Sequence, residues 1–170
     1  GFGADLGAEK FFDIKCRKSG LKPDAVVLVA TTKALKMHGG IKKDDLGSEN
    51  VDAVTMGCKN LERHIENIGK FGVPVIVAIN DYVTDTEKEQ AAIMNYCKNI
   101  GVQCKISSHW KKGGEGAADL AEEVAKIADS NSAEFKTLYD NKMSLWDKTQ
   151  YIAQNIYGAA DIIADKKVRN

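Results

Sequence analysis

Three polar segments, each following a short apolar run, hold the residues best suited to bind a ligand. They are Thr31–Gly40, Asn80–Asp85 and Ser107–Gly116. If the apolar runs form parallel strands, these segments lie together at the carboxyl edge of one sheet, where open α/β sheets bind their ligands. The sequence therefore predicts a crevice built from all three segments.

Two aromatic residues stand in this predicted crevice, outside any apolar periodicity. Tyr82 follows the second apolar run, and Trp110 follows the third. Two rings that face each other across a crevice can stack a flat heterocycle between them. The alternative interpretation of Trp110 is a hydrophobic plug at the end of a strand.

Anion binding is the other chemistry that these segments could support. The candidates are lysines and glycines, namely Lys33, Lys36, Gly39, Gly40, Gly113, Gly114 and Gly116, with His38 beside the first group. Lysine brings a positive point charge, and glycine lets backbone amides approach an anion with no side chain in the way. A flexible, solvated loop is the alternative for both groups. Asp81 and Asp85 favour helix and turn capping over a catalytic pair of carboxylates.

Strands and helices must position these segments, and the apolar pattern indicates both. Continuous runs over Ala25–Ala30 and Val73–Ile79 are typical of strands covered on both faces, and the alternating run Val102–Ile106 is typical of a strand nearer an edge. Helical spacing predicts helices over about 50–71, 86–100 and 116–128, the second opened by a Thr86-x-x-Glu89 capping box. The predicted fold class is α/β, with a parallel sheet of right-handed βαβ units in Rossmann-like or P-loop-NTPase-like layering.

The two ends of the chain differ from this middle. Residues Leu6–Lys18 predict an opening helix that Gly20 stops, and helices are expected over Ala133–Tyr139 and Ser144–Tyr157. We therefore expect an α/β domain over residues 1–130 and a helical C-terminal extension over 131–170 that packs on the same domain.

Composition excludes several classes of protein. The 24 basic and 24 acidic side chains cancel, which argues against a nucleic-acid binder. The apolar runs are far shorter than the roughly 20 residues of a membrane helix. The four cysteines form no C-x-x-C pair, so no metal site is expected. We expect them to be buried thiols in a reducing cytoplasm. The Gly1-x-Gly3 start is a weak dinucleotide signal, and no G-x-x-x-x-G-K-[ST] phosphate loop occurs in the 170 residues.

Several stretches nevertheless resemble one family in their order along the whole chain. They are Gly1–Arg17, Val29-Ala-Thr-x-x-Ala-Leu-Lys-Met-His-Gly-Gly40, Asn60-Leu-x-Arg-His-Ile-x-Asn67, Ala78-Ile-Asn80, His109-Trp-x-x-Gly-Gly-x-Gly116 and Ile156-Tyr-Gly-Ala159. Together they resemble the formate–tetrahydrofolate ligases.

That resemblance implies an ATP-dependent ligase of one-carbon metabolism. ATP would phosphorylate formate to formyl phosphate, which an amine of tetrahydrofolate would attack, with Mg²⁺ accompanying ATP. Tyr82 and Trp110 would clamp a flat ring, with Gly113 and Gly114 beside them, and Lys36, Gly39 and Gly40 would contact the acyl phosphate. The parent enzyme would be about three times longer, cytoplasmic and homo-oligomeric, with its phosphate loop upstream of Gly1, so this chain alone would be inactive.

The chain departs from the family pattern at a few positions, and two other functions stay open. Tyr82 stands where Phe is common, Val83 where Pro often follows, and Ala117 where many members have Gly. One rival is a non-catalytic binding or interaction domain that uses the same crevice. The other is a nicotinamide-dependent oxidoreductase that uses the Gly1-x-Gly3 turn.

Overall fold

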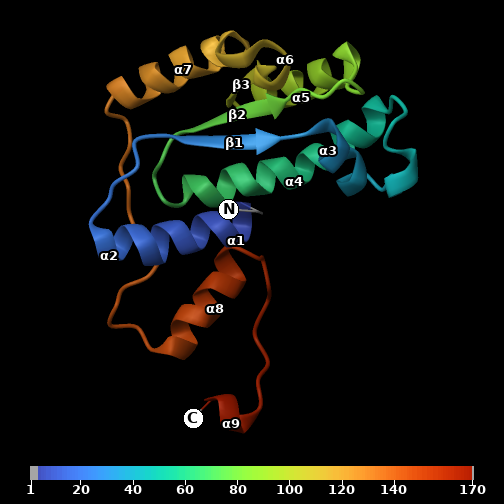
Figure 1. Cartoon of the computed structure of the whole chain (residues 1–170). Coiled ribbons are helices and arrows are strands. Elements are labelled where there is room, and N and C mark those ends of the chain that lie inside the picture. The colour runs from blue at the N-terminus through green and yellow to red at the C-terminus, as the bar shows by residue number, and fades with distance from the viewer. Residues whose placement is uncertain (1–3, 170) are drawn as a thin grey trace. The chain divides into compact units, whose positions relative to one another are not determined.

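The computed structural model describes residues 4–169, which fall into two compact units (Figure 1). One unit is Pro23–Glu134, and the other joins Gly1–Lys22 to Phe135–Asn170. The opening helix thus groups with the C-terminal segment, whereas the sequence suggested that it belonged with the sheet. The Gly1-x-Gly3 pattern lies outside the described residues.

The unit Pro23–Glu134 is a three-stranded parallel sheet with helices between its strands, as the sequence predicted. Its strands pair in the order β1-β2-β3. Its elements are β1 (Val26–Ala30), α3 (Thr32–His38), the 3₁₀ helix η2 (Lys43–Asp45), α4 (Val51–Gly69), β2 (Val75–Asn80), α5 (Glu87–Asn99), β3 (Gln103–Ser107), α6 (His109–Lys112), the 3₁₀ helix η3 (Gly113–Ala117) and α7 (Ala118–Asp129). The fold class is α/β.

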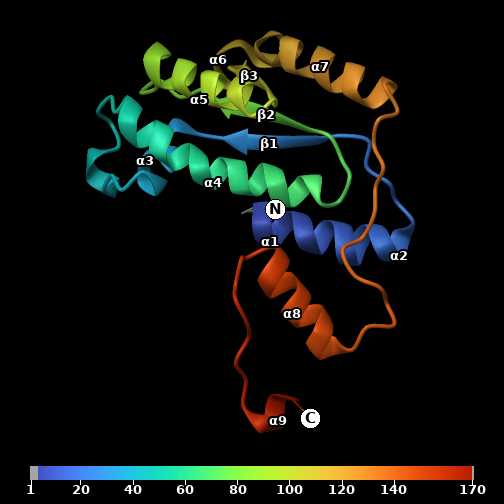
Figure 2. The same cartoon turned by 180° about the vertical axis from the view of Figure 1, so that it is seen from behind.

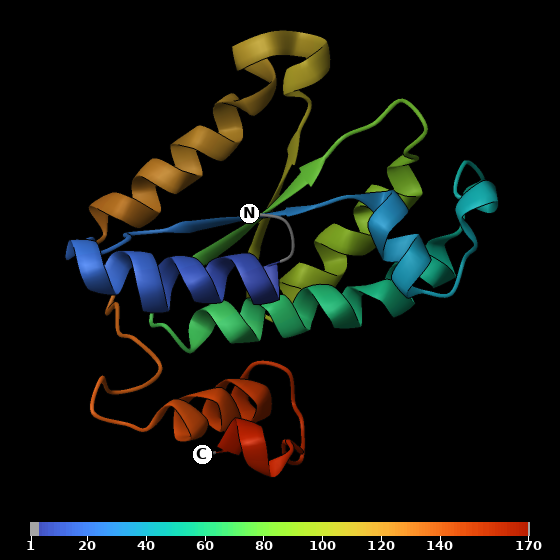
Figure 3. The ribbon, with the colours of Figure 1, turned by 60° about the horizontal axis from the view of Figure 1, so that its bottom comes forward.

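Helices α4 and α5 cover one face of this sheet, and α7 lies over the other face. Figures 1 and 2 show α4 and α7 on opposite sides of β1 and β2, and Figure 3 shows α5 running beside α4. The apolar stripe of α4 is buried as its spacing predicted, with Val54 and Cys58 fully buried. Helix α5 opens with the predicted capping box between Thr86 and Glu89. Helix α7 buries no residue completely.

The two continuous apolar runs differ in how completely they are covered. Strand β2, in the centre of the sheet, is buried on both faces from Ile76 to Ile79. Strand β1 alternates instead, because Leu28 and Ala30 are buried while Val27 and Val29 are 41% and 62% exposed. The prediction that both faces are covered is therefore wrong for β1. This strand lies at one edge of the sheet, whereas α7 packs near β3 at the other edge.

The other unit is helical. It contains α1 (Ala4–Glu9), the π-helix η1 (Lys10–Cys16), α2 (Arg17–Ser19), α8 (Leu145–Asn155) and α9 (Lys166–Arg169). The first three run continuously, and Gly20 ends them with a φ of 75°, a left-handed conformation that glycine adopts without strain. Ser144 caps α8 by accepting a hydrogen bond from the Asp147 amide.

The helix expected over Ala133–Tyr139 is absent, so that prediction is wrong. The backbone of this stretch bonds to other segments instead. The Glu134 amide donates to the Gly72 carbonyl at 2.8 Å, and the Leu138 amide donates to the Asp13 carboxylate at 2.8 Å. The Leu138 amide is a donor that a helix would have bonded to the Glu134 carbonyl, and Asp13 accepts its hydrogen bond instead.

Candidate functional site

The loops after β1, β2 and β3 meet at one edge of the sheet, as the sequence predicted. The register pairs Ala30 with Ile79 and Asn80 with Ser107, so the three strands finish nearly level. The backbone then ties the loops together, because the Asp81 amide donates to the Ser107 carbonyl at 3.1 Å. The first residues of α3, the 81–86 loop and α6 thus surround a common region.

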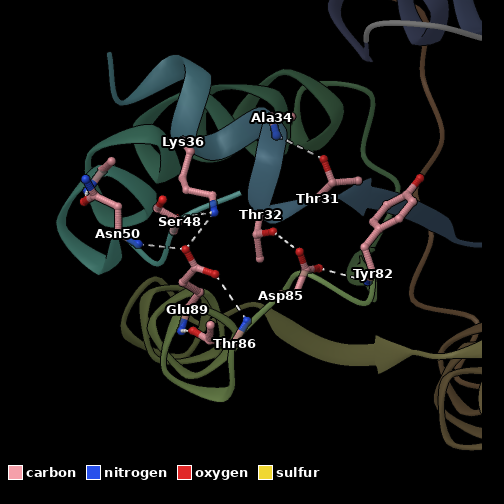
Figure 4. A network of polar contacts seen from close by, with 11 residues as sticks. Thr31, Thr32, Ala34, Lys36, Ser48, Asn50, Tyr82, Asp85, Thr86 and Glu89 are labelled. Carbon is pink, nitrogen blue, oxygen red and sulfur yellow. Dashed lines mark hydrogen bonds and ion pairs between the residues drawn. The ribbon is translucent and has the colours of Figure 1, made fainter. Parts of the chain in front are cut away.

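Tyr82 is held by the loop that carries it and by α3. Its backbone amide donates to Asp85 Oδ2 at 3.0 Å, and Asp85 Oδ1 accepts a hydrogen bond from the Thr32 hydroxyl (Figure 4). The Asn80 side-chain amide donates to the Tyr82 hydroxyl at 3.2 Å. The side chain remains 41% exposed, with the Lys33 ammonium 5.6 Å from the ring centroid. Asp85 therefore has the turn-capping role that the sequence favoured for it.

Trp110 lies on α6 and is anchored to the same loop. Its indole N–H donates to the Asp81 carbonyl oxygen, while the residue as a whole stays 49% exposed. The next residue, Lys111, binds Asp81 Oδ2 at 2.9 Å and places its ammonium 5.2 Å from the Trp110 ring centroid. A hydrophobic plug would be buried, so an anchored ring that is about half exposed does not fit that role well.

The rings of Tyr82 and Trp110 are not in contact with each other, although their loops are bonded. Ring pairs such as Phe12 with Phe11 and Phe12 with Phe135 are found among the described residues, but no ring pair there joins Tyr82 to Trp110. Each ring is therefore held by its own hydrogen bond and is about half exposed.

The glycines of the third loop divide into two kinds. A Cβ atom on Gly113 or Gly114 would meet nothing within 4 Å, so their backbone borders open space. A Cβ atom on Gly116 would lie 2.6 Å from the Ser108 carbonyl, because Gly116 closes the loop against Ser108. Gly113 and Gly114 thus leave room for a ligand, while Gly116 has a structural role that the sequence did not separate from theirs.

Lys36 lies inside the unit and is not exposed at the loop edge. Its side chain is 1% exposed, and its ammonium binds Glu89 Oε1 at 2.9 Å and the Ser48 carbonyl at 3.0 Å (Figure 4). Glu89, itself fully buried, also accepts from the backbone amides of Asn50 and Thr86. Burial alone would raise the pKa of Glu89, but the hydrogen bonds from Asn50, Lys36 and Thr86 outweigh it and hold that pKa below its ordinary value.

Gly39 and Gly40 already use their backbone amides. Gly39 donates to the Leu35 carbonyl at 2.8 Å, and Gly40 donates to the Met37 carbonyl at 3.0 Å. A Cβ atom on Gly39 would lie 2.0 Å from the Ala53 carbonyl oxygen, so this glycine lets α3 pack directly on the backbone of α4. Gly40, with a φ of 94°, borders open space.

The structure therefore separates the predicted site residues into two groups. Tyr82, Trp110, Gly113 and Gly114 share the loop edge, where Lys33 also lies, whereas Lys36 points into the interior. Sequence reasoning missed Glu89 as the partner of Lys36, because its capping-box pattern explains only its bond to Thr86. It also missed that Asp81 holds Trp110 and Lys111, for which the sequence offers no signal.

Two kinds of feature are absent from the described residues 4–169. They contain no group of three or more His, Cys, Asp or Glu side chains that could hold a metal ion. No helix among them has the length and apolar character needed to cross a membrane.

Known proteins resemble this chain over its full length. The sequence profile of the family described as formate–tetrahydrofolate ligase matches residues 1–170. The formate–tetrahydrofolate ligase of Granulibacter bethesdensis is 60% identical over 169 residues, which cover 99% of this chain and 30% of that protein. Those of Ruegeria pomeroyi and Pelagibacter ubique are 56% and 55% identical over 170 residues, again 30% of each protein. The chain spans about a third of these relatives and belongs to the formate–tetrahydrofolate ligase family.

Proposed function

We propose that this chain supplies the folate-side pocket of an ATP-dependent formate–tetrahydrofolate ligase. In that reaction ATP activates formate as formyl phosphate, and an amine of tetrahydrofolate attacks the carbonyl carbon and displaces phosphate. The observation that supports the pocket is the pair Tyr82 and Trp110, two exposed and separately anchored rings, one on the loop after β2 and the other on α6. The pterin ring of tetrahydrofolate is the flat group that they would stack.

Gly113 and Gly114 fit the same pocket because their backbone borders open space. We assign Lys36 and Gly39 an indirect part in binding the acyl phosphate, since the Lys36 charge and the Gly39 amide are already bonded. They hold α3 in place, and α3 presents Thr32 and Lys33 to the loop edge. Gly40 borders open space, but its amide is bonded to the Met37 carbonyl, so its proposed part is to let the acyl phosphate approach closely and not to donate a hydrogen bond.

Further partners are proposed for the complete ligase. ATP would bind through a phosphate loop in the rest of the protein, and Mg²⁺ would arrive with ATP, coordinated by its phosphates. A homo-oligomer in the cytoplasm is the proposed context, and the four free thiols suit a reducing compartment.

The test is Trp110→Ala in the complete ligase, with the dissociation constant of tetrahydrofolate measured by calorimetric titration. Stacking is worth roughly 1–3 kcal/mol per ring, so binding should weaken by about tenfold to a hundredfold. The melting temperature should barely fall, because truncating a half-exposed ring leaves no core cavity.

Matched controls separate stacking from other effects. Tyr82→Phe keeps the ring and loses only the bond from Asn80, so it should bind almost as the parent does, whereas Tyr82→Ala should not. Trp146→Ala removes the other tryptophan, which belongs to the helical unit, and should leave the affinity unchanged. Normal folate affinity in Trp110→Ala, with a sharply lowered melting temperature, would mean that the ring is a structural plug.

A further inference from the structure

Asp81 uses every one of its polar groups to join different parts of the loop edge. Its amide donates to Ser107, and its carbonyl accepts the Trp110 indole N–H. One carboxylate oxygen accepts from Gln90 on α5 at 2.8 Å, and the other binds Lys111 on α6 at 2.9 Å. The carboxylate is only 12% exposed, so it is not a freely solvated surface charge.

The bond to Lys111 has a consequence for the neighbouring ring. With its ammonium held by Asp81, Lys111 lies 5.2 Å from the centroid of Trp110, within cation–π range of one ring face. A ligand cannot stack on a face that the ammonium occupies. Because Trp110 is about half exposed, the opposite face of the indole is the one left for a ligand.

We infer that Asp81 is a positioning residue, which through Lys111 determines the face of Trp110 that receives a flat ligand. This inference rests on the proposed ring clamp and adds to it the residues that orient one ring. Without the Asp81 charge, Lys111 is released from its place beside the ring, and its long side chain can sample the stacking region. Ligand binding then has to order that side chain again, which weakens affinity without removing the ring.

The test uses Asp81→Asn, Lys111→Met and the double variant in the complete ligase. Asparagine keeps the shape of Asp81 and an oxygen for Gln90, and methionine keeps part of the Lys111 stem. Each single variant should raise the dissociation constant of tetrahydrofolate about three- to tenfold, the range expected for a partly buried ion pair. The double variant should bind no more weakly than the weaker single variant, because both changes break one interaction. The KM for ATP should stay unchanged.

Lys112→Met is the matched control, since Lys112 follows Lys111 on α6 and has no carboxylate partner among the described residues. It should bind tetrahydrofolate normally. Asp81→Asn placed in the Trp110→Ala background should cause no further loss.

Each outcome decides a separate question. Normal affinity in Asp81→Asn, or a full additional loss in the Trp110→Ala background, would overturn the positioning role while leaving the clamp intact. Normal affinity in Trp110→Ala would overturn the clamp itself, and with it any role for Asp81 that acts through the ring.

Discussion

Replacing Lys36 by methionine should loosen the α/β unit, because it leaves a buried carboxylate without its cation. The Lys36 and Glu89 side chains are 1% and 0% exposed, and their charged atoms lie 2.9 Å apart. Removing one partner of a buried ion pair costs about 3–5 kcal/mol. Two backbone amides, from Asn50 and Thr86, still bind the Glu89 carboxylate, which places the expected loss toward the lower end, about 3 kcal/mol.

The double variant Lys36→Met with Glu89→Gln distinguishes a structural role of Lys36 from a direct role in the reaction. A neutral glutamine has one carbonyl oxygen, so it keeps the bond from either Asn50 or Thr86, which reach different oxygens of Glu89. Because no charge is then left buried without its partner, the double variant should be less destabilised than Lys36→Met by about 1 kcal/mol. Glu89→Gln alone should be as harmful as Lys36→Met, since it leaves the ammonium unpaired. If Lys36 only holds α3 in place, turnover should recover together with stability in the double variant.

Native-state hydrogen exchange in the complete ligase is the appropriate assay, because it reports local opening free energies. The amides of α3 and α5 should exchange faster in Lys36→Met and regain protection in the double variant. Unchanged protection with abolished turnover would refute this reasoning. That result would mean that Lys36 contacts the acyl phosphate directly, as the family resemblance suggested.

Three further predictions concern the fold, the activity and the pH dependence. Gly57→Ala should destabilise the α/β unit by about 1–3 kcal/mol in denaturant unfolding, because its Cβ would lie 2.0 Å from the Leu35 carbonyl oxygen. Gly69→Ala, on the same helix with open space around it, should be neutral or slightly stabilising. Equal effects of the two substitutions would contradict the close contact between Gly57 and Leu35. The 170-residue chain alone should show no formate-stimulated release of phosphate from ATP above a heat-killed control, since it contains no G-x-x-x-x-G-K-[ST] loop. The folded-state pKa of Glu89 is lowered, so the stability that its charge contributes is present above the ordinary carboxyl pKa of about 4.3 and is lost as the pH falls further. The free energies of unfolding of the parent and of Glu89→Gln, measured from pH 7 to pH 3, should therefore become more alike in acid. A difference that stays constant over this range would contradict the prediction.

Local patterns in the sequence predicted most of the sheet and its helices. The stripe of α4 and the capping box of α5 depend on residues three or four positions apart, and both are confirmed. The two aromatic residues were identified because they lie outside any apolar periodicity. The structure places Tyr82 on the loop after β2 and Trp110 on α6, at the same edge of the sheet. These features are readable because their causes lie within one element.

Features that depend on contacts between distant segments could not be predicted from the sequence. The partner of Lys36 lies on another helix, so the pattern Lys36–Gly40 suggested an exposed anion site when the lysine is buried. The stretch Ala133–Tyr139 has helical composition, but bonds to Gly72 and Asp13 take its backbone groups. The exposure of Val27 and Val29 follows from the place of β1 in the sheet, which a run of apolar letters does not specify.

The exposed edge strand β1 affects how the 170-residue chain behaves when it is prepared without the rest of the ligase. An edge strand offers a row of backbone donors and acceptors to any other strand, and two half-exposed valines add an apolar surface beside them. Natural edge strands are commonly protected by charges, prolines or bulges, whereas β1 reads Val-Val-Leu-Val-Ala without interruption. We therefore expect preparations of the segment alone to self-associate through this strand. A charged substitution at Val29, which points away from the core, should keep them dispersed.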